Sequence, residues 1–269
     1  MKLSVVLSTQ PTQFQAATFS GNLENNLQAI ADMGYDGVEL AVRDPRLLDL
    51  EKLQESIRKY KLIVPAIGTG QAWGEEGLSF TDPNSDIRRK AIERIQSHIP
   101  LASQFQAIII IGLIRGIVSA QVSFTQAMQW LIEALVECCH VAKESGVRLA
   151  LEPINRYETS LINNVSEGMR LIDEVDAENF GLLLDSFHMN IEEPNIEASI
   201  VTCGPRIFHF HVADSNRHYA GSGHLNFQSI LYSLAQTGYQ GFISGEFLPL
   251  PDNHIAAAKN IAFLRGLPL

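Results

Sequence analysis

Short apolar runs alternate with longer segments of helical periodicity along the whole 269-residue chain. The runs are rich in Val, Ile and Leu, which is typical of buried parallel strands. Between them, apolar residues recur three or four positions apart, as at Leu131, Leu135 and Cys138, and this spacing predicts amphipathic helices. The pattern predicts eight strands, over Leu3–Leu7, Gly37–Leu40, Leu62–Ile67, Ala107–Ile111, Val147–Glu152, Gly181–Asp185, Ile207–His211 and Gly241–Glu246.

Eight strand–helix units of about 34 residues each predict a (β/α)8 barrel, the TIM barrel of the α/β class. Local signals agree, because Ser123 can cap a helix and Gly146 can end it before the next strand. The segments Gly34–Gly37 and Gly238–Gly241 share a Gly-Tyr-x-Gly pattern at corresponding helix-to-strand connections. No linker rich in Pro, Gly or Ser divides the chain, so residues 1–269 are predicted to form a single domain. A doubly wound open sheet is the alternative architecture.

The composition indicates a large hydrophobic core and disfavours some classes of binding partner. Hydrophobic residues make up 46% and charged residues 19% of the chain. The net charge of −10 disfavours nucleic-acid binding, which needs clustered Lys and Arg. The apolar stretch Ala107–Ile111 is too short for a membrane span, and the first residues do not resemble a signal peptide. Three cysteines, two of them adjacent, do not suggest a disulfide framework. We therefore expect a cytoplasmic protein that acts on a small molecule.

A glycine-rich segment, Gly68-Thr69-Gly70, follows the third predicted strand. Its spacing differs from the G-x-G-x-x-G fingerprint of dinucleotide sites, and no helix is expected to begin there. We interpret this segment as a flexible active-site loop.

Four consecutive predicted strands end in a polar residue, namely Glu152, Asp185, His211 and Glu246. One such residue alone can simply cap a helix. In a (β/α)8 barrel, however, the carboxyl ends of all strands meet at one face, so three carboxylates and one imidazole are expected to converge. The carboxylates would repel one another unless a cation lies among them. Oxygen ligands with one imidazole favour Mn²⁺, Mg²⁺ or Co²⁺. His209 shares the inward face one step deeper and is expected to pack beside the site.

The segments that carry these residues, LEPINRYE, DSFHMNIEE, HFHVADSNR and SGEF, resemble the D-tagatose 3-epimerase group of the xylose-isomerase-like barrels. The resemblance to the 5-keto-L-gluconate epimerases is closer and covers nearly the whole chain, through AVRDP, IGTGQAW, IIIGLIRG, HYAGSGH and LPLP. It implies one divalent metal ion, most readily Mn²⁺, bound by Glu152, Asp185, His211 and Glu246. It also implies that Glu152 and Glu246 are the catalytic acid–base pair, and that the enzyme forms a homodimer or homotetramer. The substrate-binding residues that it implies are Glu158, His188 and Arg217.

The resemblance implies an isomerase that inverts the carbon next to the carbonyl of a keto-sugar or keto-sugar acid. The metal would stabilise an enediolate as a Lewis acid, while two carboxylates on opposite faces of the substrate act as base and acid. A 5-keto-L-gluconate-type substrate is favoured. Ketose 3-epimerases usually have two aliphatic residues after the first glutamate, where this chain has Pro153 and Ile154. That departure points away from a free ketose.

Three more residues are expected at the substrate. Arg115 lies in the loop after the fourth predicted strand, where its guanidinium could bind a substrate carboxylate through two hydrogen bonds. Trp73 and Phe187 are expected to pack against the apolar face of a sugar. The loop Phe247–Asp252 lacks glycines and basic residues, which disfavours a phosphorylated substrate.

The residues at the strand ends also bear on other functions known for this type of barrel. An AP-endonuclease-like phosphodiesterase would need additional ligands at the ends of the third and fourth strands, where the chain has Ile67-Gly68 and Ile111-Gly112. A non-catalytic sugar-binding barrel would be expected to lack one of the two glutamates. A D-tagatose- or D-psicose-type ketose 3-epimerase and an aldose–ketose isomerase of the hydroxypyruvate type share the metal and the enediolate, so both stay open.

Overall fold

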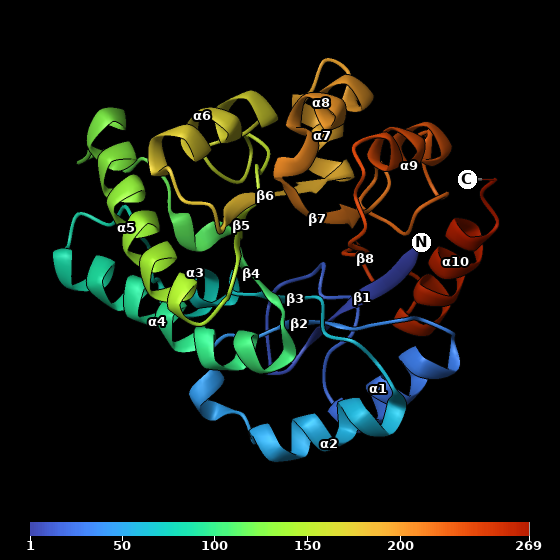
Figure 1. Cartoon of the computed structure of the whole chain (residues 1–269). Helices are drawn as coiled ribbons and strands as arrows, with labels where there is room; N and C mark the ends of the chain where they lie inside the picture. Colours follow the sequence, from blue (N-terminus) through green and yellow to red (C-terminus); the bar gives the residue numbers. More distant parts are fainter. Residues whose placement is uncertain (269) are drawn as a thin grey trace.

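Eight parallel strands close into a barrel in the computed structural model, which describes residues 1–268 (Figure 1). Each strand pairs with the next one in the sequence, and β8 closes the ring by pairing with β1, where Ser4 lies opposite Ser244. The closed ring confirms the TIM barrel and excludes the open sheet. The strands are β1 (Lys2–Ser8), β2 (Glu39–Ala41), β3 (Ala66–Gly68), β4 (Ile108–Ile111), β5 (Leu149–Leu151), β6 (Phe180–Asp185), β7 (Ile207–Val212) and β8 (Phe242–Gly245).

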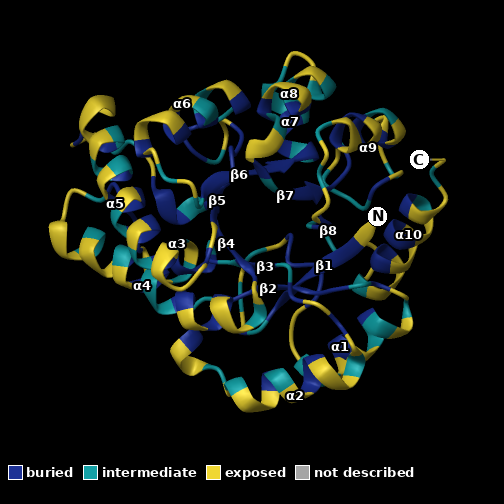
Figure 2. Cartoon of the chain, in the orientation of Figure 1, coloured by how far each residue is buried: buried dark blue, intermediate teal, exposed yellow. Residues whose placement is uncertain are grey.

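Helices surround the barrel and turn their apolar sides toward it (Figure 2). The predicted cap is present, because the Ser123 side chain accepts a hydrogen bond from the backbone N–H of Gln126. Within residues 1–268, no helix is long and apolar enough to span a bilayer. The α-helices are α1 (Leu23–Asp32), α2 (Leu50–Tyr60), α3 (Gln71–Glu76), α4 (Ser85–Phe105), α5 (Phe124–Glu144), α6 (Val165–Val175), α7 (Ser186–Glu192), α8 (Ile196–Cys203), α9 (Phe227–Gln236) and α10 (Asn253–Arg265); three 3₁₀ turns are η1 (Pro45–Leu47), η2 (Leu113–Arg115) and η3 (Gly204–Arg206).

The structure corrects two predictions around the third strand. The predicted strand Leu62–Ile67 is mostly a connection, since β3 begins only at Ala66, after Pro65, which has no N–H to donate to a neighbouring strand. The prediction that no helix follows Gly70 was wrong, because α3 begins at the next residue. This six-residue helix buries Ala72 completely, so packing rather than local sequence determines it.

Gly181 lies inside β6, the strand that ends at Asp185, and leaves no room for a side chain. A Cβ atom there would lie 2.7 Å from both the Arg206 carbonyl oxygen and the Phe208 ring. Gly181→Ala is therefore expected to lower the free energy of unfolding by about 1–3 kcal/mol, the usual cost of overpacking. Denaturant unfolding measures the change. The matched control is Gly74→Ala in α3, where a Cβ atom meets nothing within 4 Å, and an equal loss in both variants would contradict the prediction.

Candidate active site

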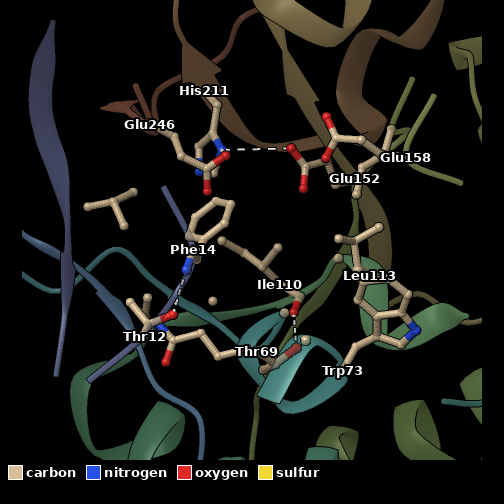
Figure 3. Close-up of a pocket in the computed structure, with 18 of the residues that line it drawn as sticks. Thr12, Phe14, Thr69, Trp73, Ile110, Leu113, Glu152, Glu158, His211 and Glu246 are labelled. Carbon is tan, nitrogen blue, oxygen red and sulfur yellow. Dashed lines mark hydrogen bonds and ion pairs between the residues drawn. The ribbon is translucent and has the colours of Figure 1, made fainter. Parts of the chain in front are cut away.

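The structure brings Glu152, Asp185, His211 and Glu246 together at the carboxyl ends of their strands. Figure 3 shows three of them, Glu152, His211 and Glu246. Asp185 is the last residue of β6 and pairs in register with His211 of β7. The His211 Nδ1 atom lies 3.9 Å from Glu152 Oε1, 3.8 Å from Asp185 Oδ2 and 3.8 Å from Glu246 Oε2. One ligand atom of each residue lies within 4.8 Å of all the others. The predicted convergence of these four side chains is therefore present.

Both glutamates continue the hydrogen-bond pattern of the sheet just beyond their strands. The Glu152 N–H donates to the Ile111 carbonyl of β4 at 3.2 Å, and the Glu246 N–H donates to the Val212 carbonyl of β7 at 3.3 Å. These bonds fix the backbone of both residues at the barrel rim, so each side chain starts from a position that the sheet determines.

The electrostatics of this cluster call for a cation. Burial raises the pKa of Glu152 well above its ordinary value, and the Glu246 carboxylate raises it further. Burial also raises the pKa of Glu246, to about 7, and that of Asp185. Glu152 Oε1 and His211 Nδ1 are buried with no hydrogen-bond partner among residues 1–268. Three oxygen donors, one nitrogen donor and these two unpartnered atoms fit a divalent metal ion.

Glu39, which the sequence analysis did not select, lies directly behind this cluster. The His211 Nε2 atom lies 3.0 Å from both carboxylate oxygens of Glu39, and His209 Nε2 lies 2.7 Å from Glu39 Oε2. Burial opposes the charge on Glu39, but His211 and His209 hold its pKa well below the ordinary value. The available signal was a charged residue inside the apolar run Gly37–Leu40. His209 does pack beside the site, as expected.

His188 presents an N–H to the same centre. Its Nδ1 accepts a hydrogen bond from the Asn155 side-chain amide at 2.8 Å, which places the hydrogen of the neutral ring on Nε2. Burial lowers the pKa of His188 well below its ordinary value, so the ring is neutral near pH 7. The Nε2 atom lies 3.7 Å from Glu152 Oε1, at the edge of the cluster.

Arg217 and Glu158 form a pair at the cavity wall. The Arg217 Nη1 atom lies 2.9 Å from Glu158 Oε1, and its Nη2 lies 3.9 Å from Glu246 Oε2. The guanidinium stacks over the Phe187 ring at 4.9 Å. Phe187 is not among the described residues that line the cavity, so it supports Arg217 rather than packing against a sugar. The loop that carries Arg217 is organised by Asp214, whose carboxylate accepts backbone hydrogen bonds.

The cluster forms one end of a cavity of about 290 Å³, a volume for a small ligand. Figure 3 shows the labelled carboxylates and His211 on one side, and Phe14, Leu113 and Trp73 on the other. Trp73 thus lines the cavity, and its contact with a sugar stays a prediction. Glu75 of α3 accepts a hydrogen bond from the backbone N–H of Gln13 at 2.7 Å, which ties the β1–α1 loop to α3. The carboxylates therefore form one end of the cavity, and the apolar side chains of Phe14, Leu113 and Trp73 lie at the other end together with Thr12 and Glu75.

Arg115, like Phe187, lies outside the cavity lining where the sequence predicted a substrate contact. Its side chain is completely buried, and it is absent from the described residues that line the cavity. The guanidinium donates to the backbone carbonyls of Gly112, Leu161, Ile162 and Glu152. The turn η2 directs this side chain inward, where four backbone carbonyl groups accept from four of its five N–H donors. Arg115 therefore supports the backbone at Glu152 and does not present its charge to a ligand.

This fold and site define a (β/α)8 barrel with an acidic, metal-compatible centre at the carboxyl ends of its strands. The chain belongs to the Xylose isomerase-like TIM barrel family, which it matches over residues 27–267. This match confirms the fold and the family expected from the sequence motifs.

Named relatives agree with that assignment. The chain is 31% identical over 226 residues to the L-ribulose 3-epimerase of Methylomonas sp. (strain DH-1), covering 80% of this chain and 75% of the relative. It is 29% identical over 265 residues to the 3-dehydro-D-guloside 4-epimerase of Escherichia coli (strain K12), covering 94% and 98%. The D-psicose 3-epimerase structure from Clostridium cellulolyticum H10 shares the fold, with a TM-score of 0.85, 22% identity and 98% coverage of both chains. These relatives are named as carbohydrate epimerases, so the predicted enzyme class, an isomerase, is confirmed.

Proposed function

We propose that this protein is a divalent-metal-dependent epimerase that inverts the carbon next to the carbonyl of a small keto-sugar. The observation that carries the proposal is the convergence of Glu152 and Glu246, from two separate strands, on the group that also contains Asp185 and His211. Inversion of a carbon centre by proton transfer needs one group that removes a proton from one face and another that delivers a proton to the opposite face, and two carboxylates can fill these roles. The names of the relatives support the same reaction type.

The proton exchange is assigned to the two glutamates. They follow β5 and β8, which lie three places apart in the ring, so their carboxylates reach a bound substrate from different sides. One removes the proton and the other returns a proton to the opposite face. Burial raises the pKa of both groups, so either can hold a proton during the reaction. A divalent cation bound there, with Mn²⁺ preferred, supplies Lewis-acid stabilisation of the developing negative charge.

The remaining polar residues position the substrate oxygens. His188 Nε2–H can donate to an oxygen near the carbonyl, because its other nitrogen already accepts from Asn155. Arg217 offers N–H donors at the same wall, where Glu158 orients it. The apolar end of the cavity, with Phe14 and Trp73, accommodates the carbon side of the substrate.

The cavity favours a neutral keto-sugar over a keto-sugar acid. Arg217 is the only Arg or Lys among the described residues that line the cavity, and it already faces Glu158 and Glu246. Arg115 donates to backbone carbonyls outside the cavity and so cannot bind a substrate carboxylate. Glu75 adds a negative charge near Phe14 and Trp73. A ketose of the L-ribulose or D-psicose type is therefore the first candidate. 5-Keto-L-gluconate is the second candidate, supported by the motif resemblance, and its carboxylate would have to bind at Arg217.

A substrate panel tests the proposal directly. Neutral ketoses and keto-sugar acids, including 5-keto-L-gluconate, are incubated with the Mn²⁺-loaded protein, and the products are separated by stereochemistry. We expect a neutral ketose to yield its epimer at the carbon next to the carbonyl with the highest kcat/KM. If only aldose products form, the protein is an aldose–ketose isomerase and the proposed epimerase activity is wrong. If only keto-sugar acids are turned over, 5-keto-L-gluconate becomes the first candidate substrate and a neutral ketose the second.

Arg217→Ala is expected to lower kcat/KM by about ten- to a hundredfold, because a charge-assisted hydrogen bond to the substrate contributes roughly 1.5–3 kcal/mol. Steady-state kinetics on the best substrate measures the loss. The matched control is Arg156→Ala, which breaks an exposed pair with Glu192 outside the cavity lining. Equal activity of the two variants would remove Arg217 from substrate binding.

A further inference from the structure

We infer that Glu39 is a positioning residue that fixes the orientation and the tautomer of His211, so that His211 Nδ1 is the nitrogen presented to the metal ion. The inference rests on the metal centre of the proposed function and adds a residue that holds that centre in place. It concerns two strands, β2 and β7, that lie on different sides of the barrel ring.

The hydrogen bonds to Glu39 determine which nitrogen of His211 faces the metal ligands. An ionised carboxylate can only accept hydrogen bonds, so the Nε2 atom 3.0 Å from both oxygens must carry a hydrogen. Nδ1 is then the nitrogen whose lone pair is left for a cation in the neutral ring. This atom lies 3.8–3.9 Å from the carboxylates of Glu152, Asp185 and Glu246, and it is buried without a hydrogen-bond partner among residues 1–268.

Without Glu39, the opposite tautomer would be favoured. Three carboxylates face Nδ1 and would attract a hydrogen to that atom, which would block it as a metal ligand. Glu39 supplies a competing acceptor at Nε2 and therefore keeps one hydrogen on the far side of the ring. Carboxylates that accept from the second nitrogen of a metal-binding histidine act in this way in metalloproteins.

His209 holds Glu39 rather than the metal. Its Nε2 lies 2.7 Å from Glu39 Oε2, and its ring contacts that of His211 edge-on, with the centroids 5.2 Å apart. The hydrogen-bond partners of the Glu39 carboxylate among residues 1–268 are these two imidazoles. A second metal ion between Glu39 and the two histidines is the alternative interpretation. The separations of 2.7–3.0 Å between their atoms, however, are those of direct hydrogen bonds.

The first test is Mn²⁺ binding to the full chain, measured as Kd and stoichiometry by titration calorimetry and Mn²⁺ electron paramagnetic resonance. Glu39→Gln keeps the shape of the side chain but removes its charge, and it is expected to raise the Kd for Mn²⁺ by about ten- to a hundredfold. The matched control, Glu192→Gln, removes the charge of another largely buried glutamate, which pairs with Arg156 and does not line the cavity. We expect its Kd to stay close to that of the unmodified protein, with one ion bound per chain.

The second test needs no substitution at Glu39. Nitrogen-15 spectra of the unmodified protein loaded with Mg²⁺ report the tautomer of each histidine, and the signal that is lost in His211→Asn is assigned to His211. We expect His211 to carry its hydrogen on Nε2, protected from exchange with water.

The outcomes separate the inference from the function on which it rests. Unchanged Mn²⁺ affinity in Glu39→Gln, or an equal loss in Glu192→Gln, would overturn the inference. A second Mn²⁺ ion lost with Glu39, or a hydrogen on Nδ1 of His211, would also overturn it. An unmodified protein that binds no divalent metal would overturn both this inference and the metal-dependent function. A protein that binds Mn²⁺ as expected but turns over no sugar of the panel would overturn the proposed function alone, since the Kd comparison needs no substrate.

Discussion

Chelation of divalent cations is expected to abolish turnover and to lower the melting temperature. Glu152 and Asp185 are buried beside His211, and the Glu246 side chain is only 13% exposed. Arg217 lies 3.9 Å from Glu246 but also pairs with Glu158, so its single charge does not neutralise three carboxylates. A cation that binds only the folded chain stabilises it, by about 2.7 kcal/mol when its free concentration is a hundred times the Kd. Its removal leaves the carboxylates repelling one another. Activity assays and thermal melts before and after chelation measure both effects.

Restoration by added metal completes this test. Mn²⁺ or Co²⁺ is expected to recover both the activity and the melting temperature, and Mg²⁺ is the third candidate. Asp185→Asn is expected to weaken metal binding, whereas Asp36→Asn, on the surface connection before β2, serves as its matched control. Full turnover by a protein shown to contain no metal would contradict the prediction.

Replacing either Glu152 or Glu246 with Gln is expected to stop net epimerisation. Each face of the substrate would lose its acid or base, and one positioned proton-transfer group contributes about 10²–10⁴ in rate. Because both residues are also proposed metal ligands, metal content is measured in each variant before the rates are compared. A variant that retains its metal and the full rate would exclude that glutamate from proton transfer.

Heavy water distinguishes the two-base reaction from its alternatives in the unmodified protein. One glutamate keeps the proton taken from the substrate while the other delivers a deuteron from solvent, so early product is expected to carry deuterium at the inverted carbon. Recovered substrate is expected to stay mostly unlabelled. A hydride shift would leave the product unlabelled, and one mobile base would return part of the original hydrogen. Mass spectrometry and nuclear magnetic resonance of early product provide the measurement, and unlabelled early product would refute the two-base reaction.

The architecture and the four residues at the centre of the site could be predicted from the sequence. Buried parallel strands appear as continuous apolar runs, such as Ile108–Ile111 in β4 and Gly181–Leu184 in β6, because both of their faces are covered. Parallel strands all end at one face of a barrel, so Asp185 and His211 could be expected to meet once both strands were recognised. Neither inference needed a long-range contact to be known in advance.

The roles of the side chains behind this centre depend on contacts that form only when the chain folds. Glu39 meets His211 across 172 positions of sequence, and no local pattern encodes such a pair. Arg115 occupies a loop at the expected face, yet its turn and the carbonyls of the β5–α6 loop direct it away from the cavity. The helix that begins at Gln71 depends in the same way on the burial of Ala72. Strand positions follow from hydrophobic periodicity along the chain, whereas the direction of a side chain depends on backbone dihedrals and on partners that folding brings from distant segments.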